Sequence, residues 1–234
     1  ERVLTVSEDN RGHLARIHRV DPARVRVVRI GVPDPGPVSP AGLRKQTGIG
    51  SSAFVLIAVG ALEERKGHRH AIDALGLLPG DVHLFVAGSG EAREKLSARA
   101  AAAGVAGRVH FLGQRTDVSS LLADADCLVL SSELEATPYV IVEAMAAGLP
   151  VVASGIFGIP ELVEEGVTGL LVPPGDPAAI ARAIAALAAD PAIRRRMGAA
   201  ARRRYEERFT LERFVAETVA VYRELLDATK GGDA

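Results

Sequence analysis

Short apolar runs alternate with helix-like segments along most of the chain. Several runs, such as residues 54–59 and 82–87, consist largely of Val, Ile, Leu, Phe and Ala, which is typical of strands covered by helices on both faces. The segments between them open near Gly, Ser, Thr or Asp and close near Gly, Pro or Asp, as helices do. This alternation predicts an α/β domain with a doubly wound parallel sheet. We expect strands over residues 3–6, 25–30, 54–59, 82–87, 109–112, 127–130, 151–153 and 170–172, and helices over residues 67–78, 91–103, 118–123 and 138–147.

The alternation stops at a turn cluster, residues 173–177, and the rest of the chain is predicted to be helical. Asp176 and Asp190 can each cap a helix that has a proline in its first turn. Thr210 can cap a third helix over residues 211–227, where apolar side chains recur at three-to-four spacing and must pack on another surface. A Pro-rich connector, residues 33–40, separates the first two strands from the main sheet.

Composition and charge exclude several classes of protein. The 234 residues correspond to about one and a half domains, and the net charge of −1 provides no basic field for a nucleic-acid partner. No apolar stretch reaches the roughly 18 residues that cross a bilayer, and the start lacks a signal peptide. A single cysteine, Cys127, lies in an apolar run, which favours a reducing, cytoplasmic setting. Because the sequence opens on Glu1 and enters a strand at once, we expect it to be part of a longer chain.

Ligands of an open parallel sheet bind beyond the carboxyl ends of its strands, so the loops at that edge hold the candidate chemistry. The loop over residues 60–67, which opens on Gly60, places Arg65 and Lys66 just before a helix start. Cations beside free backbone N–H groups form an anion site. An equal alternative is that both cations balance Glu63 and Glu64 in a solvated loop.

Three further loops carry weaker signals. Gly88 begins a Gly-Ser-Gly sequence that permits a ligand to approach the protein backbone closely, but the third glycine of a dinucleotide-binding fingerprint is missing. In the loop over residues 113–117, Gln114 and Arg115 line a pocket or face solvent, and Asp117 is expected to cap the next helix. Glu161 stands in the first turn of a short helix, where it suits the helix dipole whether or not it has a function.

The loop after residues 127–130 is the most informative. Thr137 is expected to cap the helix that follows and Pro138 to set its first turn. Glu143 is the only charge in an apolar helix, so it requires hydrogen-bond donors if it is buried. Sugar hydroxyls are one possible source of these donors, and a neighbouring arginine or backbone N–H is the other. We expect Glu143 to lie deep and Glu135 to stand at the rim of the helix mouth.

Other candidates carry little weight. Asp124 and Asp126 resemble a metal-binding pair, but they precede their strand and so lie at the wrong edge of the sheet. His68 and His70 point apart on one helix, and no residue set completes a zinc site, so no metal is expected. A basic helical face is best explained as solvated, with contact to anionic lipid headgroups as a minority interpretation. Its members are Arg194, Arg195, Arg196, Arg202, Arg203, Arg204 and Arg208.

Together these residues resemble the C-terminal, donor-binding domain of glycosyltransferase family 4, whose retaining enzymes consist of two facing Rossmann-like domains (the GT-B fold). The likeness covers almost the whole chain. Its most specific element is the Glu-x7-Glu pair Glu135 and Glu143. Matching order and spacing also occur over residues 60–67, 88–90, 111–113 and 158–172.

The resemblance implies a fold and a division of roles. Residues 1–40 would be the end of a preceding domain and its linker, residues 41–210 the nucleotide-sugar domain, and residues 211–234 a terminal helix that packs on the N-terminal acceptor domain. Lys66 and Arg65 would contact the diphosphate, Glu143 the ribose hydroxyls and Glu135 the transferred sugar. Gly60 and Gly88 would lie beside the donor, Gln114 and Arg115 would flank the base, and the segment Thr137, Pro138, Tyr139 and Val140 would meet sugar or phosphate.

The expected activity is transfer of a hexose from a UDP- or GDP-type donor to a glycan, lipid or small-molecule acceptor, without a cofactor or metal in this domain. The expected location is the cytoplasm, with the inner membrane surface as an alternative, and the chain alone is expected to be inactive. Two departures from the family pattern, Ala61 in place of Arg and the segment 135–138 in place of Glu-Gly-Phe-Gly, bear on the donor. A non-catalytic nucleotide-sugar binding module and a sugar-nucleotide epimerase are the alternatives.

Overall fold

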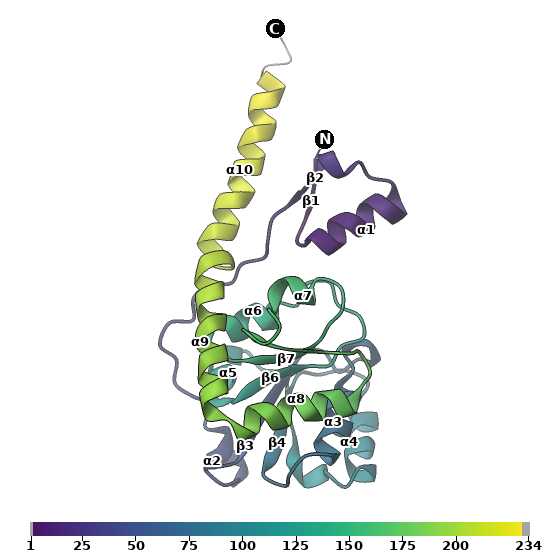
Figure 1. Ribbon diagram of the computed structural model, residues 1–234, viewed down its shortest axis with the longest axis vertical. Helices are drawn as coiled ribbons and strands as arrows, with labels where there is room; N and C mark the ends of the chain where they lie inside the picture. The colour runs from purple at the N-terminus through teal and green to yellow at the C-terminus, as the bar shows by residue number, and fades with distance from the viewer. Residues whose placement is uncertain (1, 231–234) are drawn as a thin grey trace.

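The computed structural model describes residues 2–230. Its main body is a six-stranded, wholly parallel sheet in the order β5-β4-β3-β6-β7-β8. The order reverses between the first and second halves of the chain, as in a doubly wound fold, which confirms the predicted fold class (Figure 1). The strands are β3 (Phe54–Val59), β4 (Val82–Ala87), β5 (Val109–Gly113), β6 (Cys127–Leu130), β7 (Val151–Ser154) and β8 (Gly169–Val172).

Helices cover both faces of this sheet because its strands are apolar on both sides. Along β3, Leu56 and Ala58 join the core under one set of helices, and Val55 and Ile57 join the core under the other. The first set is α3 (His68–Gly76), α4 (Arg93–Ala102) and α8 (Pro177–Ala189). The second is α5 (Val118–Asp124), α6 (Tyr139–Ala146), the short α7 (Ile159–Leu162) and α9 (Pro191–Arg208).

A small two-stranded parallel sheet forms the upper part of the molecule (Figure 1). It consists of β1 (Val3–Thr5) and β2 (Val25–Val27), joined by α1 (Glu8–His18) and the short turn η1 (Pro22–Arg24). The expected strand over residues 25–30 is therefore shorter than predicted, and α1 was not predicted. The last helix, α10 (Leu211–Lys230), runs beside this sheet, where Arg26 of β2 pairs with Glu224 at 2.9 Å.

Two segments join the upper part to the main body, and they are bonded to each other. The N–H of Val32 donates to Phe209 O at 3.1 Å, and the N–H of Leu211 donates to Val32 O at 3.0 Å. The hydroxyl of Tyr205, at the end of α9, also donates to Val32 O at 3.1 Å. As predicted, Thr210 caps α10, since its hydroxyl accepts from the N–H of Arg213 at 3.3 Å.

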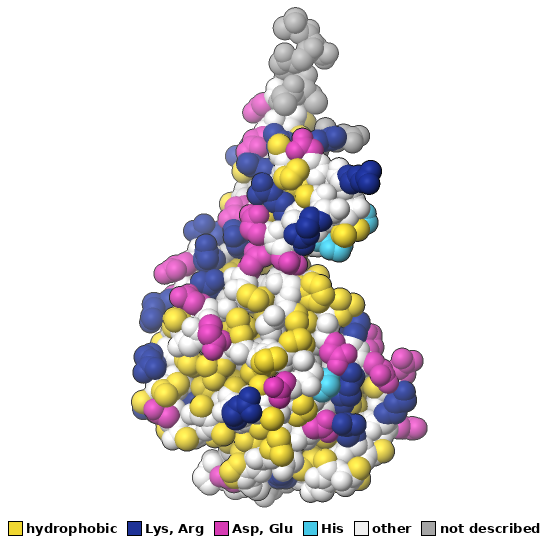
Figure 2. Space-filling view, turned by 45° about the vertical axis from the view of Figure 1, so that its right-hand side comes forward, with side chains coloured by type: hydrophobic (Ala, Val, Ile, Leu, Met, Phe, Trp, Pro, Cys, Tyr) yellow, Lys and Arg dark blue, Asp and Glu magenta, His cyan; other side chains and the backbone are white. Residues whose placement is uncertain are grey.

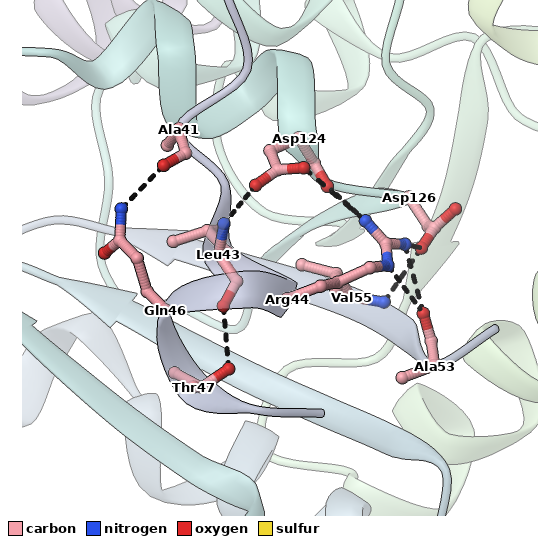
Figure 3. Close-up of polar contacts among 9 residues, drawn as sticks. All are labelled: Ala41, Leu43, Arg44, Gln46, Thr47, Ala53, Val55, Asp124 and Asp126. Carbon is pink, nitrogen blue, oxygen red and sulfur yellow. Dashed lines mark hydrogen bonds and ion pairs between the residues drawn. The ribbon is translucent and has the colours of Figure 1, made fainter. Parts of the chain in front are cut away.

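The amino edge of the sheet holds the Asp124 and Asp126 pair, in the position that the sequence predicts. Arg44 lies on α2 (Leu43–Thr47), a helix that the sequence did not predict, and donates to Asp126 at 2.5 Å and to Asp124 O at 2.9 Å (Figure 3). Asp126 also accepts from the N–H of Val55 at 2.9 Å. These carboxylates therefore anchor α2 to the sheet. Among residues 2–230, no helix combines the length and the apolar composition needed to cross a bilayer.

Candidate functional site

The loops that follow β3 and β6 meet at the carboxyl edge of the sheet, on the side opposite α2. The N–H of Glu133 donates to Arg65 O at 2.8 Å, and the hydroxyl of Ser131 donates to Gly67 O at 2.8 Å. Gly67 has φ of 60°, and a Cβ at that position would lie 2.0 Å from Ser131 O. Only glycine allows the two backbones to come this close. The contact places Lys66, in the turn η2 (Glu64–Lys66), against the loop that carries Glu135.

Lys66 and Glu135 form the central ion pair of the site. Lys66 Nζ lies 2.5 Å from Glu135 Oε1, and the hydroxyl of Ser132 donates to the same oxygen at 2.9 Å. The side chains are only 17% and 7% exposed. Among the described residues, Glu135 Oε2 has no hydrogen-bond partner. One carboxylate oxygen of this buried group is thus available to a ligand.

Glu143 projects from the middle of α6 and is half-buried. Its carboxylate has no hydrogen bond or ion pair to any residue in the described part of the chain, so the neighbouring arginine considered above is not present. Burial raises the pKa of Glu143 above its ordinary value, because water stabilises the charged form and the protein here does not. The expected depths were wrong: Glu135 is the more buried of the two, because Lys66 and Ser132 hold it inside the loop.

The N-terminus of α6 is not capped as predicted. Pro138 occupies the N-cap position, and no side chain caps the helix. Thr137 was expected to do so, but its hydroxyl is buried and has no hydrogen-bond partner in the structure. The N–H groups of Tyr139 and Val140 lie in the first turn, where a helix provides no acceptor for them. Free N–H groups at a helix start favour an anion.

The two neighbouring arginines are held by local carboxylates. Arg65 is 46% exposed and pairs with Glu63 at 2.7 Å. The solvated-loop interpretation therefore describes Arg65 correctly but not Lys66. Arg115 makes two bonds to Asp117, at 2.7 and 2.6 Å. Asp117 was expected to cap α5; it stands at the N-cap position, but its side chain makes no capping bond because Arg115 occupies it.

Gly60 and Gly88 allow the loop after β3 and the loop after β4 to pack closely against each other. A Cβ at Gly88 would lie 1.9 Å from Gly60 O. The N–H of Leu62 also donates to Ser89 O at 2.9 Å. The backbone that comes close to Gly88 is therefore that of the loop after β3, and the pair of glycines fixes where that loop, and Lys66 with it, stands. Gln114 is exposed on the neighbouring loop.

A cavity of about 370 Å³ lies between these loops and α1, and Figure 2 shows the notch between the upper part of the molecule and its rounded body. The wall that α1 contributes was not predicted from the sequence, because the helix itself was not predicted. Ser7, a good N-cap residue ahead of two acidic residues, was the signal that could have found it. The lining residues are Ser7, Asp9, Asn10, His13, Arg65, Leu134, Glu135, Ala136 and Phe157.

The two histidines of α3 bond to their surroundings. His68 is buried with Nε2 3.1 Å from Ala61 O, and His70 Nε2 lies 2.6 Å from Glu133. Burial lowers the pKa of His68, which favours its neutral form. Among residues 2–230, no group of three His, Cys, Asp or Glu side chains is close enough to hold a metal ion.

Comparison with known proteins gives a family match and many relatives. The family model described as "Glycosyl transferases group 1" matches residues 42–204. The chain is 40% identical over 147 residues to the lipopolysaccharide core biosynthesis glycosyltransferase LpsE of Rhizobium meliloti, a match that covers 63% of this chain and 43% of LpsE. It is 35% identical over 202 residues to the D-inositol 3-phosphate glycosyltransferase of Mycolicibacterium gilvum, covering 82% of this chain and 45% of that protein. The chain thus spans about half the length of these relatives.

Solved structures agree with the fold. The structure of Anabaena HepE in complex with UDP superposes with a TM-score of 0.88 at 28% identity, over 94% of this chain and 64% of HepE. HepE has also been solved in complex with UDP-glucose, and that structure superposes with a TM-score of 0.87 at 30% identity, over 94% of this chain and 64% of HepE.

Proposed function

Because this chain belongs to the group 1 glycosyl transferase family, we propose that it is the donor-binding part of an enzyme that transfers a hexose from a nucleotide-diphosphate sugar. We place the enzyme in glycosyltransferase family 4 and propose that the reaction retains the anomeric configuration. Residues 1–40 would end a preceding acceptor-binding domain, and α10 would pack against that domain. The acceptor would be a glycan, a lipid or a small molecule.

One observation carries the proposal: the buried pair of Lys66 and Glu135 leaves one carboxylate oxygen free, in the loop that leads into α6, whose start has no side-chain cap and whose Glu143 has no partner among the described residues. A nucleotide-diphosphate sugar presents the complementary groups, namely an anion and two sets of hydroxyls. Lys66 and the N–H groups of Tyr139 and Val140 would stabilise the charge that develops on the leaving diphosphate. Because Arg65 stands next to Lys66 and is exposed, it can turn from Glu63 towards the same diphosphate.

Glu143 and Glu135 would each accept hydrogen bonds from a different set of donor hydroxyls. Glu143 would accept from the ribose hydroxyls, which supply the donors that it lacks in the free protein. Glu135 Oε2 would accept from the transferred sugar while Oε1 stays with Ser132. Gly60 and Gly88 hold the loop after β3 in place, and Gln114 and Arg115 would flank the base. A UDP-type donor is favoured over a GDP-type donor because UDP and UDP-glucose are the ligands in the HepE structures.

A screen of nucleotide sugars by thermal unfolding tests the proposal on the chain as it is. A ligand that binds the folded state alone raises Tm, and the rise grows with the logarithm of one plus the ratio of its concentration to Kd. We expect UDP sugars, or failing those GDP sugars, to raise Tm, and Glu143→Ala to abolish the rise while Glu94→Ala, an exposed glutamate on α4, leaves it unchanged. If no nucleotide sugar raises Tm, the proposal is wrong.

The same chain is expected to bind donor without transferring sugar, since the proposed acceptor domain lies outside residues 1–234. Incubation with the donor identified by the screen and a panel of acceptors, followed by NMR of the anomeric protons, measures this. Sugar transfer by this chain alone would contradict the division of labour proposed here.

A further inference from the structure

A carboxylate of the main body caps the first helix of the upper part. Glu161, on α7, accepts from the N–H of Asp9 at 2.8 Å and from the N–H of Glu8 at 3.0 Å. These residues lie 152 and 153 positions apart in the sequence. Both amides are at the start of α1, which stands directly above α7 (Figure 1). The capping bonds therefore tie the upper part to the edge of the candidate site.

The start of α1 is fixed in register by this contact and by two others. Ser7 accepts from the N–H of Asn10 at 3.1 Å, so the first three amides of the helix all have acceptors. Gly158, next to α7, is packed so tightly that a Cβ there would lie 2.8 Å from Ala136 O and 3.3 Å from Ser7 Cβ. Ala136 directly follows Glu135. The start of α1, the loop before α7 and the loop that carries Glu135 thus form one packed unit.

The side of α1 that this unit presents to the cavity is polar. Asp9, Asn10 and His13 line it, at the spacing that places residues on one helical face. In the described part of the chain, the side chains of Asp9 and Asn10 have no hydrogen-bond partner. They face the same cavity as Glu135, whose second oxygen is also free. Unpaired acceptors and donors on both walls of a cavity of this size suit a ligand with many hydroxyls.

We propose that Glu161 is a positioning residue for sugar recognition: by capping α1 it holds Asn10 and His13 opposite Glu135, where they bind hydroxyls of the transferred sugar. This inference rests on the proposed function. It places the transferred sugar between the two walls of the cavity, with Glu135 on one wall and α1 on the other. The loops of the main body would bind the nucleotide diphosphate, and α1 would contribute only to the sugar.

Amide hydrogen exchange of Glu8 and Asp9, resolved by NMR, tests the capping without any ligand. Glu161→Ala should raise their exchange rates by about 10-fold or more, because both lose their acceptor. Glu161→Gln keeps one acceptor oxygen and should give a smaller increase. Glu164→Gln, which alters an exposed carboxylate three residues away, is the matched control. Unchanged exchange in Glu161→Ala would overturn the proposal whatever the ligand.

Calorimetric titration of the full chain with UDP and with UDP-glucose tests the role in recognition. Glu161→Ala should weaken the binding of UDP-glucose about 5- to 10-fold and the binding of UDP less than about twofold, as expected for hydrogen bonds made to the sugar alone. Asn10→Ala and His13→Ala should show the same split while the Glu8 and Asp9 amides stay protected. Combining Glu161→Ala with His13→Ala should weaken UDP-glucose no more than the larger single effect.

The outcomes separate this inference from the proposed function. If Glu161→Ala weakens UDP and UDP-glucose equally, or weakens neither, Glu161 does not act through the sugar and the inference is wrong while nucleotide binding stands. If the wild-type chain binds neither compound, the UDP-type donor is wrong and the sugar role of α1 falls with it, even where the exchange result confirms the cap.

Discussion

Glu143 carries a charge that is unfavourable in the free protein and that, in the proposed function, binds the ribose hydroxyls of the donor. A carboxylate whose pKa is raised on folding stabilises the native state when it is protonated, and this contribution is lost as the pH rises through the folded pKa. At neutral pH the charge of Glu143 therefore destabilises the free protein. In the proposed function, the ribose hydroxyls of the donor would stabilise that charge.

Glu143→Gln should consequently stabilise the free protein at pH 7 by about 0.5 kcal/mol, a small figure because the group is partly exposed and screened by water. The gain should vanish near pH 4, where the wild-type carboxyl is itself largely protonated. Urea unfolding at the two pH values measures the difference, with Glu94→Gln as control. A loss of stability at pH 7 would mean that the carboxylate is paired in solution.

At the scale of elements, the position of Lys66 depends on how closely the loop after β3 approaches the loop after β6. Gly67→Ala introduces both a left-handed alanine and a collision with Ser131 O, whereas Gly104→Ala, at φ of 69° with open space around it, introduces only the first. We expect Gly104→Ala to cost about 1 kcal/mol and Gly67→Ala about 2–4 kcal/mol. Chemical denaturation measures both. Equal losses of unfolding free energy would show that the close contact between Gly67 and Ser131 O does not constrain the two loops.

The opposite edge of the sheet should matter for stability alone. Arg44→Ala removes a guanidinium that bonds Ala53 O, Asp124 O and Asp126, and leaves two partly buried carboxylates with fewer partners. A loss of about 2–3 kcal/mol in unfolding free energy is expected, with nucleotide affinity unchanged. Lys45→Ala, on the same helix and exposed, should change neither quantity. A change in nucleotide affinity for Arg44→Ala would contradict the assignment of function to the carboxyl edge.

The elements that the sequence predicts well are those whose stability is local or wholly apolar. The strands over residues 54–59, 82–87 and 127–130 match the structure at both ends. Their residues are almost all apolar, and such runs are buried in the core between two layers of helices. The first helix was missed because it is polar, and part of its capping comes from Glu161, a residue that no local pattern connects to it. The relative depths of Glu135 and Glu143 were wrong for the same reason, since Lys66 lies 69 positions before Glu135.

At the scale of the whole molecule, the chain matches only part of the length of its relatives. The chain spans 43% of LpsE and 45% of the inositol phosphate relative. Its upper sheet and α10 lie at one end of the main body (Figure 1), to which they are joined by the bonded segments at Val32 and Thr210 and by the bonds from Glu8 and Asp9 to Glu161. The resemblance noted from Glu135 and Glu143 is confirmed at the level of the group 1 glycosyl transferase family.

The proposed function depends above all on nucleotide-diphosphate binding through Lys66 at the carboxyl edge of the sheet. Calorimetric titration of UDP into the wild-type chain, Lys66→Ala and the control Lys45→Ala measures this binding. We expect wild type and Lys45→Ala to bind UDP with equal affinity, and Lys66→Ala to bind it about 10- to 100-fold more weakly, because it loses a charge-assisted bond to phosphate. Equal UDP affinity in all three proteins would contradict it.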